Sequence, residues 1–303
     1  MKIERIYFRV VALALCVGVL PFLFSRAYAQ EPPTEQETSK VENRWLDDYH
    51  TKIGFTYGTD ATLQSAYLWR GLYVGAFNVQ GSANVGYGGL YATMWWNIGT
   101  TDWAFSTFQP EVDIIVGFSR WGLTLNAVYI HNFDCGFFDF HNYPDKGNNF
   151  ELGLRYTVSS KLPLSILWAT RVTAKDGYIY DGSFTPMFNK GAAIGDTVRA
   201  YSTYIELSYK HTFPYDISLY GAIGMTPWRS MYTGYKKEFA VHNIDIRLRK
   251  DWSVSERCGL MVMGELMINP SALADDRSTA QWHPKSPGKQ SVNANIAFGV
   301  YLK

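Results

Sequence analysis

Charge, cysteine and long apolar runs are all scarce in this chain of 303 residues. Only 18% of the residues are charged, which is low for a soluble domain. The formal net charge of +1 leaves no basic surplus, so nucleic acid is excluded as a predicted partner. Beyond the N-terminus there is no run of about 18 apolar residues, which argues against helices that span a membrane.

Aromatic residues and glycine are abundant instead. Phe, Trp and Tyr make up 16% of the chain, and there are 26 glycines. The mean hydropathy is −0.14, so the apolar residues are diluted by polar ones. Disordered chains have few aromatics and much charge, so disorder is excluded as well. The composition indicates a glycine-rich and aromatic-rich protein made mostly of β-strands.

The first 29 residues have the three parts of a secretory signal peptide. The start is basic, residues 10–24 are apolar but too few to span a membrane, and Ala27-Tyr28-Ala29 fits the small-x-small cleavage pattern. We predict cleavage after Ala29 and export. Residues 30–50 are acidic and polar and are predicted to form a flexible periplasmic leader, which leaves residues 51–303 as the folded domain.

From Lys52 onward, apolar side chains alternate with small or polar ones, which is the period of a β-strand. The alternation continues over residues 53–69 at one end of the domain and over residues 292–302 at the other. Strands of soluble sandwiches average about 5–6 residues. Runs of about ten residues cross a bilayer when the strand is tilted. Twelve such runs are predicted between residues 53 and 302.

The predicted connections alternate between short and long. Short links fall at Gly88-Gly89, at Ser119-Arg120 and at residues 159–163, 212–216 and 250–256, whereas long links cover residues 131–148, 175–198, 226–239 and 269–289. Short periplasmic turns and long extracellular loops are typical of outer-membrane barrels. The sequence therefore predicts an all-β protein, a transmembrane antiparallel up-and-down β-barrel of about twelve strands. A secreted β-sandwich or propeller explains the alternation but not the loop asymmetry.

Charged residues fall on the polar face of these strands, which a barrel turns toward its lumen. The lumen and selectivity candidates divide evenly into acids and bases: Arg70, Glu111, Asp113, Glu151, Arg155, Arg171, Glu206, Lys210, Asp245, Arg247, Arg249 and Glu265. Unpaired buried charge is costly, so opposite charges are expected to pair, with Asp245, Arg247 and Arg249 able to meet acids across the barrel. The network either lines a narrow water-filled pore or fills the barrel and closes it.

Aromatic residues and cysteines give further expectations. Tyr67, Trp69, Trp96 and Trp168 are expected in an aromatic girdle at the membrane interface. Aromatic clusters in residues 133–143 and 178–188 form either a lid or a platform for ligand stacking. Metal-ligand spacings are missing, so neither a metal nor another cofactor is predicted. Cys135 and Cys258 fall at opposite ends of the predicted barrel and are expected to be free thiols.

One segment carries a resemblance to a known family. Ser65-Ala66-Tyr67-Leu68-Trp69-Arg70-Gly71 contains a Tyr-x-aromatic-Arg-Gly signature at the predicted end of the first strand. In this the chain resembles the TorF family of porins, and the likeness extends to roughly Tyr156. The resemblance implies an outer-membrane barrel. The family often has an acidic residue at the position of Ala66, so Arg70 lacks a polar partner from that position.

The predicted function is a porin-like channel in a Gram-negative outer membrane, not an enzyme. Small polar solutes would pass passively through a narrow charged lumen. The alternatives are a closed structural or adhesin-type barrel and, third, an outer-membrane lipid hydrolase. Support for a hydrolase is limited to three pairs that match a catalytic motif in part: His131-Asn132, His141-Asn142 and His242-Asn243. Expected partners are outer-membrane lipids, lipopolysaccharide and, during insertion, the barrel-assembly machinery; the sequence does not specify the solute.

Overall fold

The computed structural model describes residues 55–100, 108–133, 136–139, 148–159, 161–173, 176–182, 191–235, 238–273 and 292–302. The predicted signal peptide, the leader at residues 30–50 and Cys135 lie outside these residues. Nearly every ordered element is a β-strand. Within the described ranges, no helix is long and apolar enough to cross a membrane.

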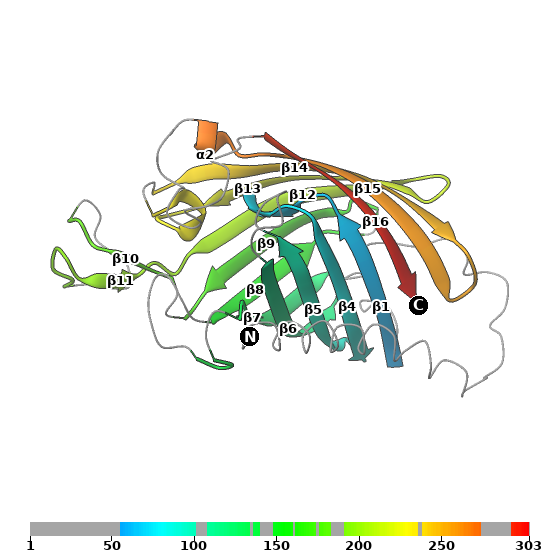
Figure 1. Cartoon of the computed structure of the whole chain (residues 1–303), viewed down its shortest axis with the longest axis horizontal. Coiled ribbons are helices and arrows are strands. Elements are labelled where there is room, and N and C mark those ends of the chain that lie inside the picture. The colour runs from blue at the N-terminus through cyan, green and yellow to red at the C-terminus, as the bar shows by residue number, and fades with distance from the viewer. Residues whose placement is uncertain are drawn as a thin grey trace.

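Among the described residues, twelve strands close into one antiparallel barrel (Figure 1). In chain order they are β1 (Phe55–Gln64), β4 (Asn78–Tyr87), β5 (Leu90–Thr100), β6 (Phe108–Arg120), β7 (Leu123–His131), β8 (Asn149–Thr157), β9 (Leu164–Arg171), β12 (Thr203–Phe213), β13 (Ile217–Thr226), β14 (Ala240–Ser253), β15 (Cys258–Ile268) and β16 (Val292–Leu302). Pairing of β1 with β16 closes the ring, so the sheet has no open edge. The predicted fold and strand number are confirmed.

The two ends of the barrel differ in their connections. Two-residue turns join β4 to β5 and β6 to β7 at what we call the turn end, whereas the connections at the opposite, loop end are longer. The turn after β6 is Trp121-Gly122 rather than the predicted Ser119-Arg120. Both turn residues have a positive φ, 56° and 78°, as a two-residue hairpin turn of type I′ requires.

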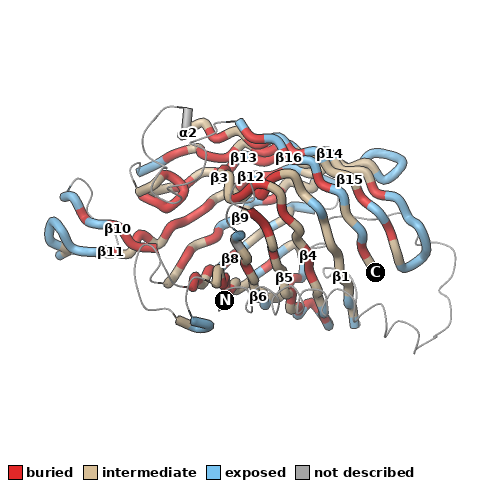
Figure 2. The backbone as a smooth tube through the Cα atoms, viewed as in Figure 1, coloured by how far each residue is buried: buried red, intermediate tan, exposed pale blue. Residues whose placement is uncertain are grey.

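Exposure alternates along the barrel strands, as Figure 2 shows by its changing colours. On β16 the outward positions are exposed and apolar, whereas the inward positions are mostly buried and include two asparagines. Phe298 is 55% exposed and Asn295 is 2% exposed. Apolar surface outside and polar side chains inside reverse the arrangement of a soluble protein and are typical of a membrane barrel.

Exposed aromatic side chains gather near the strand ends. At the turn end they are Phe55, Tyr57, Tyr87, Trp121, Tyr156, Phe213, Tyr215 and Trp252, and at the loop end Phe108, Trp168 and Phe239. Aromatic rings favour the level of the lipid headgroups because one part of the ring is apolar and another part is wet. These two groups of rings therefore suit the two interfaces of a bilayer.

Two short hairpins leave the barrel at the loop end. The inner hairpin consists of β2 (Tyr67–Trp69) and β3 (Leu72–Gly75), between β1 and β4 in the chain. The outer hairpin consists of β10 (Gly177–Ile179) and β11 (Thr197–Arg199), and it projects beyond the barrel at the left of Figure 1. A single turn of 3-10 helix, η2 (Met231–Thr233), follows β13, and a short helix, α2 (Pro270–Leu273), follows β15.

Candidate functional site: the barrel interior and its inner hairpin

The chain leaves the barrel wall at Ser65. β1 pairs with β16 as far as Gln64. Ser65 N then donates to the Ile296 carbonyl at 3.0 Å, and Ser65 Oγ accepts from Ile296 N at 2.8 Å. The amide oxygen of Asn295 accepts from Ala66 N at 3.1 Å. A hydroxyl and a side-chain amide thus replace the partners that the sheet would have supplied, and the chain can turn inward.

The inner hairpin turns at Arg70-Gly71, where φ is 48° and 83°. A Cβ atom on Gly71 would lie 1.9 Å from the His242 carbonyl oxygen, so only glycine fits against β14. His242 Nδ1 donates to the Arg70 carbonyl at 3.0 Å, and Asn269 Nδ2 donates to the Gly71 carbonyl at 2.9 Å. The Arg-Gly part of the signature is therefore the tight turn of a hairpin seated inside the barrel.

Tyr67 and Trp69 consequently lie inside the barrel, and the expectation of an interfacial position is wrong for both. Tyr67 is buried with its ring 5.7 Å from that of Trp95 on β5, and the Trp69 ring lies 5.6 Å from that of Tyr232. The alternation in the sequence runs on to residue 69, but the wall strand ends at Gln64.

The other two girdle candidates point outward. Trp96 covers Gly81 on the outer face of β4, where an added Cβ would meet the indole at 2.3 Å. Trp168 is 42% exposed on β9, and its ring lies 6.0 Å from that of Trp228. Both positions are compatible with the lipid-facing surface, and their place in a girdle stays a prediction.

The guanidinium of Arg70, at the tip of the hairpin, reaches Glu151 on β8. Nη1 and Nη2 donate to the two carboxylate oxygens at 2.6 and 2.8 Å, and Nη1 also donates to the Tyr232 hydroxyl at 2.7 Å. The guanidinium carbon lies 4.8 Å from the ring centroids of both Trp69 and Tyr204. Forked charge-assisted bonds combine here with cation–π contacts. Arg70 thus finds in β8 the acidic partner that position 66 lacks.

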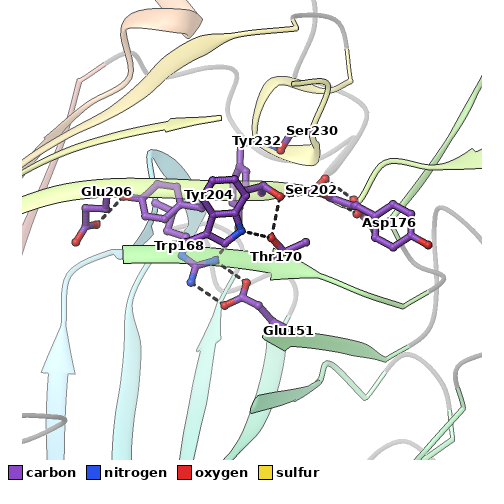
Figure 3. A network of polar contacts seen from close by, with 12 residues as sticks. Glu151, Trp168, Thr170, Asp176, Ser202, Tyr204, Glu206, Ser230 and Tyr232 are labelled. Atoms are coloured by element: carbon purple, nitrogen blue, oxygen red, sulfur yellow. Dashed lines mark hydrogen bonds and ion pairs between the residues drawn. The ribbon is translucent and has the colours of Figure 1, made fainter. Parts of the chain in front are cut away.

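The surroundings of Arg70 are held by contacts of their own (Figure 3). Tyr204 donates to Glu206 at 2.7 Å and accepts from Asn243 Nδ2 at 2.8 Å. Tyr232, on η2, stacks on His242 with the ring centroids 4.9 Å and the planes 6° apart. Tyr204, Tyr232 and His242 are fully buried. We call Glu151, Tyr204, Tyr232 and Trp69 the Arg70 site.

Most other interior arginines pair with acids nearby on the wall. The pairs are Arg155 with Glu206 at 3.8 Å, Arg247 with Asp245 and with Glu265 at 3.0 Å, and Arg249 with Asp251 at 2.6 Å. Arg247 and Glu265 are direct partners in the β14–β15 register. Asp245, Arg247 and Arg249, for which the sequence allows a meeting with acids across the barrel, form their ion pairs on the same or the adjacent strand.

Three further candidates surround the inner hairpin. Arg171 is buried opposite Glu151 in the β8–β9 register, with its guanidinium carbon 5.4 Å from the Trp69 ring centroid. Glu111 is buried on β6 and hydrogen-bonds Tyr67. Asp113 pairs in register with Trp95, on which Tyr67 packs. The last candidate, Lys210, lies nearer the turn end of β12, opposite Tyr220.

The interior wall is chemically uneven. The side formed by β1, β4, β5 and β16 carries mostly neutral polar groups: Thr62, Gln64, Asn78, Gln80, Ser82, Asn84, Thr93, Asn97, Asn293 and Asn295. The charged candidates concentrate on β6, β8, β9, β12, β14 and β15. The structure adds two acids, Asp60, which accepts from Ser82 Oγ at 2.5 Å, and Asp251. Within the part of the chain that the structure describes, acids therefore outnumber bases in the interior.

Sequence reasoning missed Tyr204 and Tyr232, and it considered His242 only as part of the His242-Asn243 pair. Tyr204 lies two residues before Glu206 on β12 and so on the same, polar face of the strand. An aromatic residue on that polar face is the signal that could have identified it. Tyr232 lies in a loop turn and His242 near the start of a strand, where alternation says little. The partners of His131 and His242 are the Asn148 side chain and a main-chain carbonyl.

Neither a metal centre nor a disulfide is evident in the described ranges. These ranges contain no group of three or more His, Cys, Asp or Glu side chains that could hold a metal ion. Cys258 is a free thiol at the start of β15. The described interior offers hydrogen bonds, ion pairs and aromatic faces.

Comparisons with known proteins give similarity of structure without similarity of sequence. No protein-family model matches the chain, and no curated protein matches it. Among solved structures it is similar to the KdgM porin, with a TM-score of 0.40, 8% identity and coverage of 81% of this chain and 98% of that one. It is similar also to the NanC porin, with a TM-score of 0.43, 11% identity and coverage of 82% of this chain and 100% of that one. An outer-membrane channel from Pseudomonas putida F1 is similar as well, with a TM-score of 0.43, 11% identity and coverage of 87% of this chain and 99% of that one. At this level of similarity, function has to be argued from the barrel's own side chains.

Proposed function

We propose that the chain is an outer-membrane channel through which small polar solutes pass passively. Support for the location comes from the closed barrel, its exposed apolar outer face and the aromatic rings near both ends. The resemblance of Ser65–Gly71 to the TorF porins fits the same proposal. The loop end then faces the outside of the cell, with the turn end in the periplasm.

The polar interior crossed by one hairpin carries this proposal. A twelve-stranded barrel is wider than an eight-stranded one. Side chains can fill the interior of an eight-stranded barrel. The inner hairpin lies on a polar wall and reaches Glu151 with Arg70. Hydrophilic lining in a barrel of this width supports passage of water-soluble molecules, and the hairpin narrows the path near the loop end.

Conductance of the folded chain in planar bilayers, with a panel of neutral, anionic and cationic solutes, tests the channel directly. We expect small stepwise currents. Arg247→Gln combined with Arg249→Gln should move the reversal potential toward cation selectivity, because two interior positive charges are lost. Arg120→Gln, an exposed arginine lying over Trp121 at the turn end, is the matched control.

The outcome separates the candidate functions. Repeated absence of current from correctly folded protein would favour the closed structural or adhesin-type barrel. Currents with an unchanged reversal potential in the double variant would show that Arg247 and Arg249 do not line the path. Lipid hydrolysis by the folded protein would favour the hydrolase.

A further inference from the structure

The surroundings of Arg70 have the form of a ligand site that is already filled. We propose that the barrel contains a binding site for guanidinium-bearing solutes, and that the hairpin's own arginine occupies it as a tethered ligand. The inference deepens the proposed channel by naming a solute class. Only the transport of such a solute rests on the proposed channel function, because its binding can be measured on the barrel in detergent.

The geometry around Arg70 is specific for a guanidinium group. Glu151 offers both carboxylate oxygens to two nitrogens, at 2.6 and 2.8 Å, and the Tyr232 hydroxyl accepts from one of them at 2.7 Å. The rings of Tyr204 and Trp69 lie 4.8 Å from the guanidinium carbon. A flat fork of donors matches this arrangement, whereas a compact ammonium ion reaches one oxygen well and has no flat face to stack.

Most of the site belongs to the barrel and not to the hairpin. Glu151 lies on β8, Tyr204 on β12 and Tyr232 on η2, and only Trp69 comes from the inner hairpin. Tyr204 and Tyr232 are held by Asn243 and His242 as described above. Loss of the Arg70 side chain would therefore leave a carboxylate, a hydroxyl and an aromatic face still placed for a second guanidinium.

The charges around the site also favour a cation. The Glu151 side chain is 5% exposed, so its charge needs a partner inside the barrel. Arg171 lies opposite Glu151 in register, yet its guanidinium lies over Trp69 and makes no hydrogen bond from Nε or Nη1. The fork on Glu151 is thus taken by Arg70 and not by Arg171.

Because Arg70 is covalently attached to the barrel, a free guanidinium solute would have to compete with it for the site. An attached ligand acts at an effective concentration in the millimolar range or above. Guanidinium added at about 10 mM should therefore bind poorly to the native barrel and well to a barrel without the arginine side chain.

The experiment uses the folded full chain in detergent and guanidinium chloride as the probe, with sodium and ammonium chloride at equal ionic strength. Binding is measured by calorimetric titration and by the rise in unfolding temperature. We expect Arg70→Ala to bind guanidinium about tenfold more tightly than the native chain. The gain should disappear in Arg70→Ala combined with Glu151→Gln and should be weaker for ammonium. Arg120→Ala is the matched control and should behave as the native chain.

The proposal is overturned if Arg70→Ala binds guanidinium no better than the native chain, or if the Glu151→Gln change leaves the gain intact. Should Arg70→Ala not form a folded barrel, Arg70→Lys keeps the charge but loses the fork. Guanidinium should then displace the lysine at lower concentration than the native arginine, and equal concentrations would overturn the proposal. Binding without any guanidinium current would instead count against the channel and leave the site in place.

Discussion

The strands of the inner and outer hairpins are nearly equal in length, but the two hairpins leave the same end of the barrel in opposite directions. The strands of the inner hairpin have 3 and 4 residues, and those of the outer hairpin have 3 each. The inner hairpin contacts side chains of β5, β8, β12 and β14. The outer hairpin packs around Tyr178, Tyr180, Val198 and Ala200 and leaves Ile179 59% exposed.

Tip chemistry and tight backbone fit seat the inner hairpin inside the barrel. The inner tip presents an arginine to a buried carboxylate and a glycine to a main-chain carbonyl. The outer hairpin is held at its base instead, where Tyr178 stacks on Tyr235 with the centroids 5.5 Å apart and Asp176 binds Ser202. Within the described residues, the inner hairpin therefore shapes the barrel interior, whereas the outer hairpin makes its contacts at the loop end.

Deletion of each hairpin gives the largest expected contrast. Replacement of residues 67–75 by a short glycine-serine linker should raise single-channel conductance at least about twofold, because the path near the loop end widens. Replacement of β10, β11 and the residues between them by a similar linker should leave conductance close to native. Equal changes in the two variants would contradict the assignment of the constriction to the inner hairpin.

A methyl group added at one glycine in each hairpin tests how tightly each of the two turns is packed. Gly71→Ala places a Cβ 1.9 Å from the His242 carbonyl at a φ of +83°, so we expect a loss of more than about 3 kcal/mol in the free energy of unfolding. Gly195→Ala, in the connection between β10 and β11, has a φ of +95° but meets nothing within 4 Å, so the loss should stay near 1 kcal/mol. Thermal unfolding in detergent measures both, and similar losses would mean that the inner turn is not tightly seated.

The smallest expected effect concerns pH at the base of the outer hairpin. Asp176 is fully buried, and burial raises the pKa of its carboxyl to about 6, against the opposing hydrogen bonds from Ser202. The folded state thus binds this proton more tightly than the unfolded state does, so the contribution to stability falls as pH rises from about 4 to 6. Protection factors of the amides in β10 and β11, which are corrected for the intrinsic pH dependence of amide exchange, should be higher at pH 5 than at pH 7.

Asp176→Asn is the control for this pH effect. An asparagine does not titrate, so the protection factors of the variant should no longer differ between pH 5 and pH 7, while its amide oxygen can still accept from Ser202. The inner hairpin should show the same exchange rates in both proteins. A pH dependence of the protection factors that survives the substitution would assign the effect to another group.

Strand number and loop asymmetry were predictable because each barrel strand meets lipid on one face and polar groups on the other. This gives a strong two-residue period, visible for example from Val292 to Leu302. The inner hairpin was not predictable, because the same period continues through Ser65 to Trp69. What ends β1 is a tertiary contact with Asn295, which lies 230 residues away in sequence.

The pairing of charges was predictable only in part. Arg247 and Glu265 follow from strand register once the strands are known. Arg70 and Glu151 are 81 residues apart, and their meeting depends on the width of the barrel and the reach of the hairpin. Neither quantity is encoded in local sequence, so the sequence alone does not assign the partner of Arg70.

The exit of the chain at Ser65 also has a consequence for assembly. Several of the contacts that seat the inner hairpin come from the last third of the chain, namely from Asn295 on β16, Asn269 after β15 and His242 on β14. The inner hairpin is made early in synthesis, so it can form these contacts only after the last strands have been made. The hairpin can therefore become fully seated only late in folding, and a chain truncated before β16 would lack the Asn295 contact at the point where the hairpin leaves the wall.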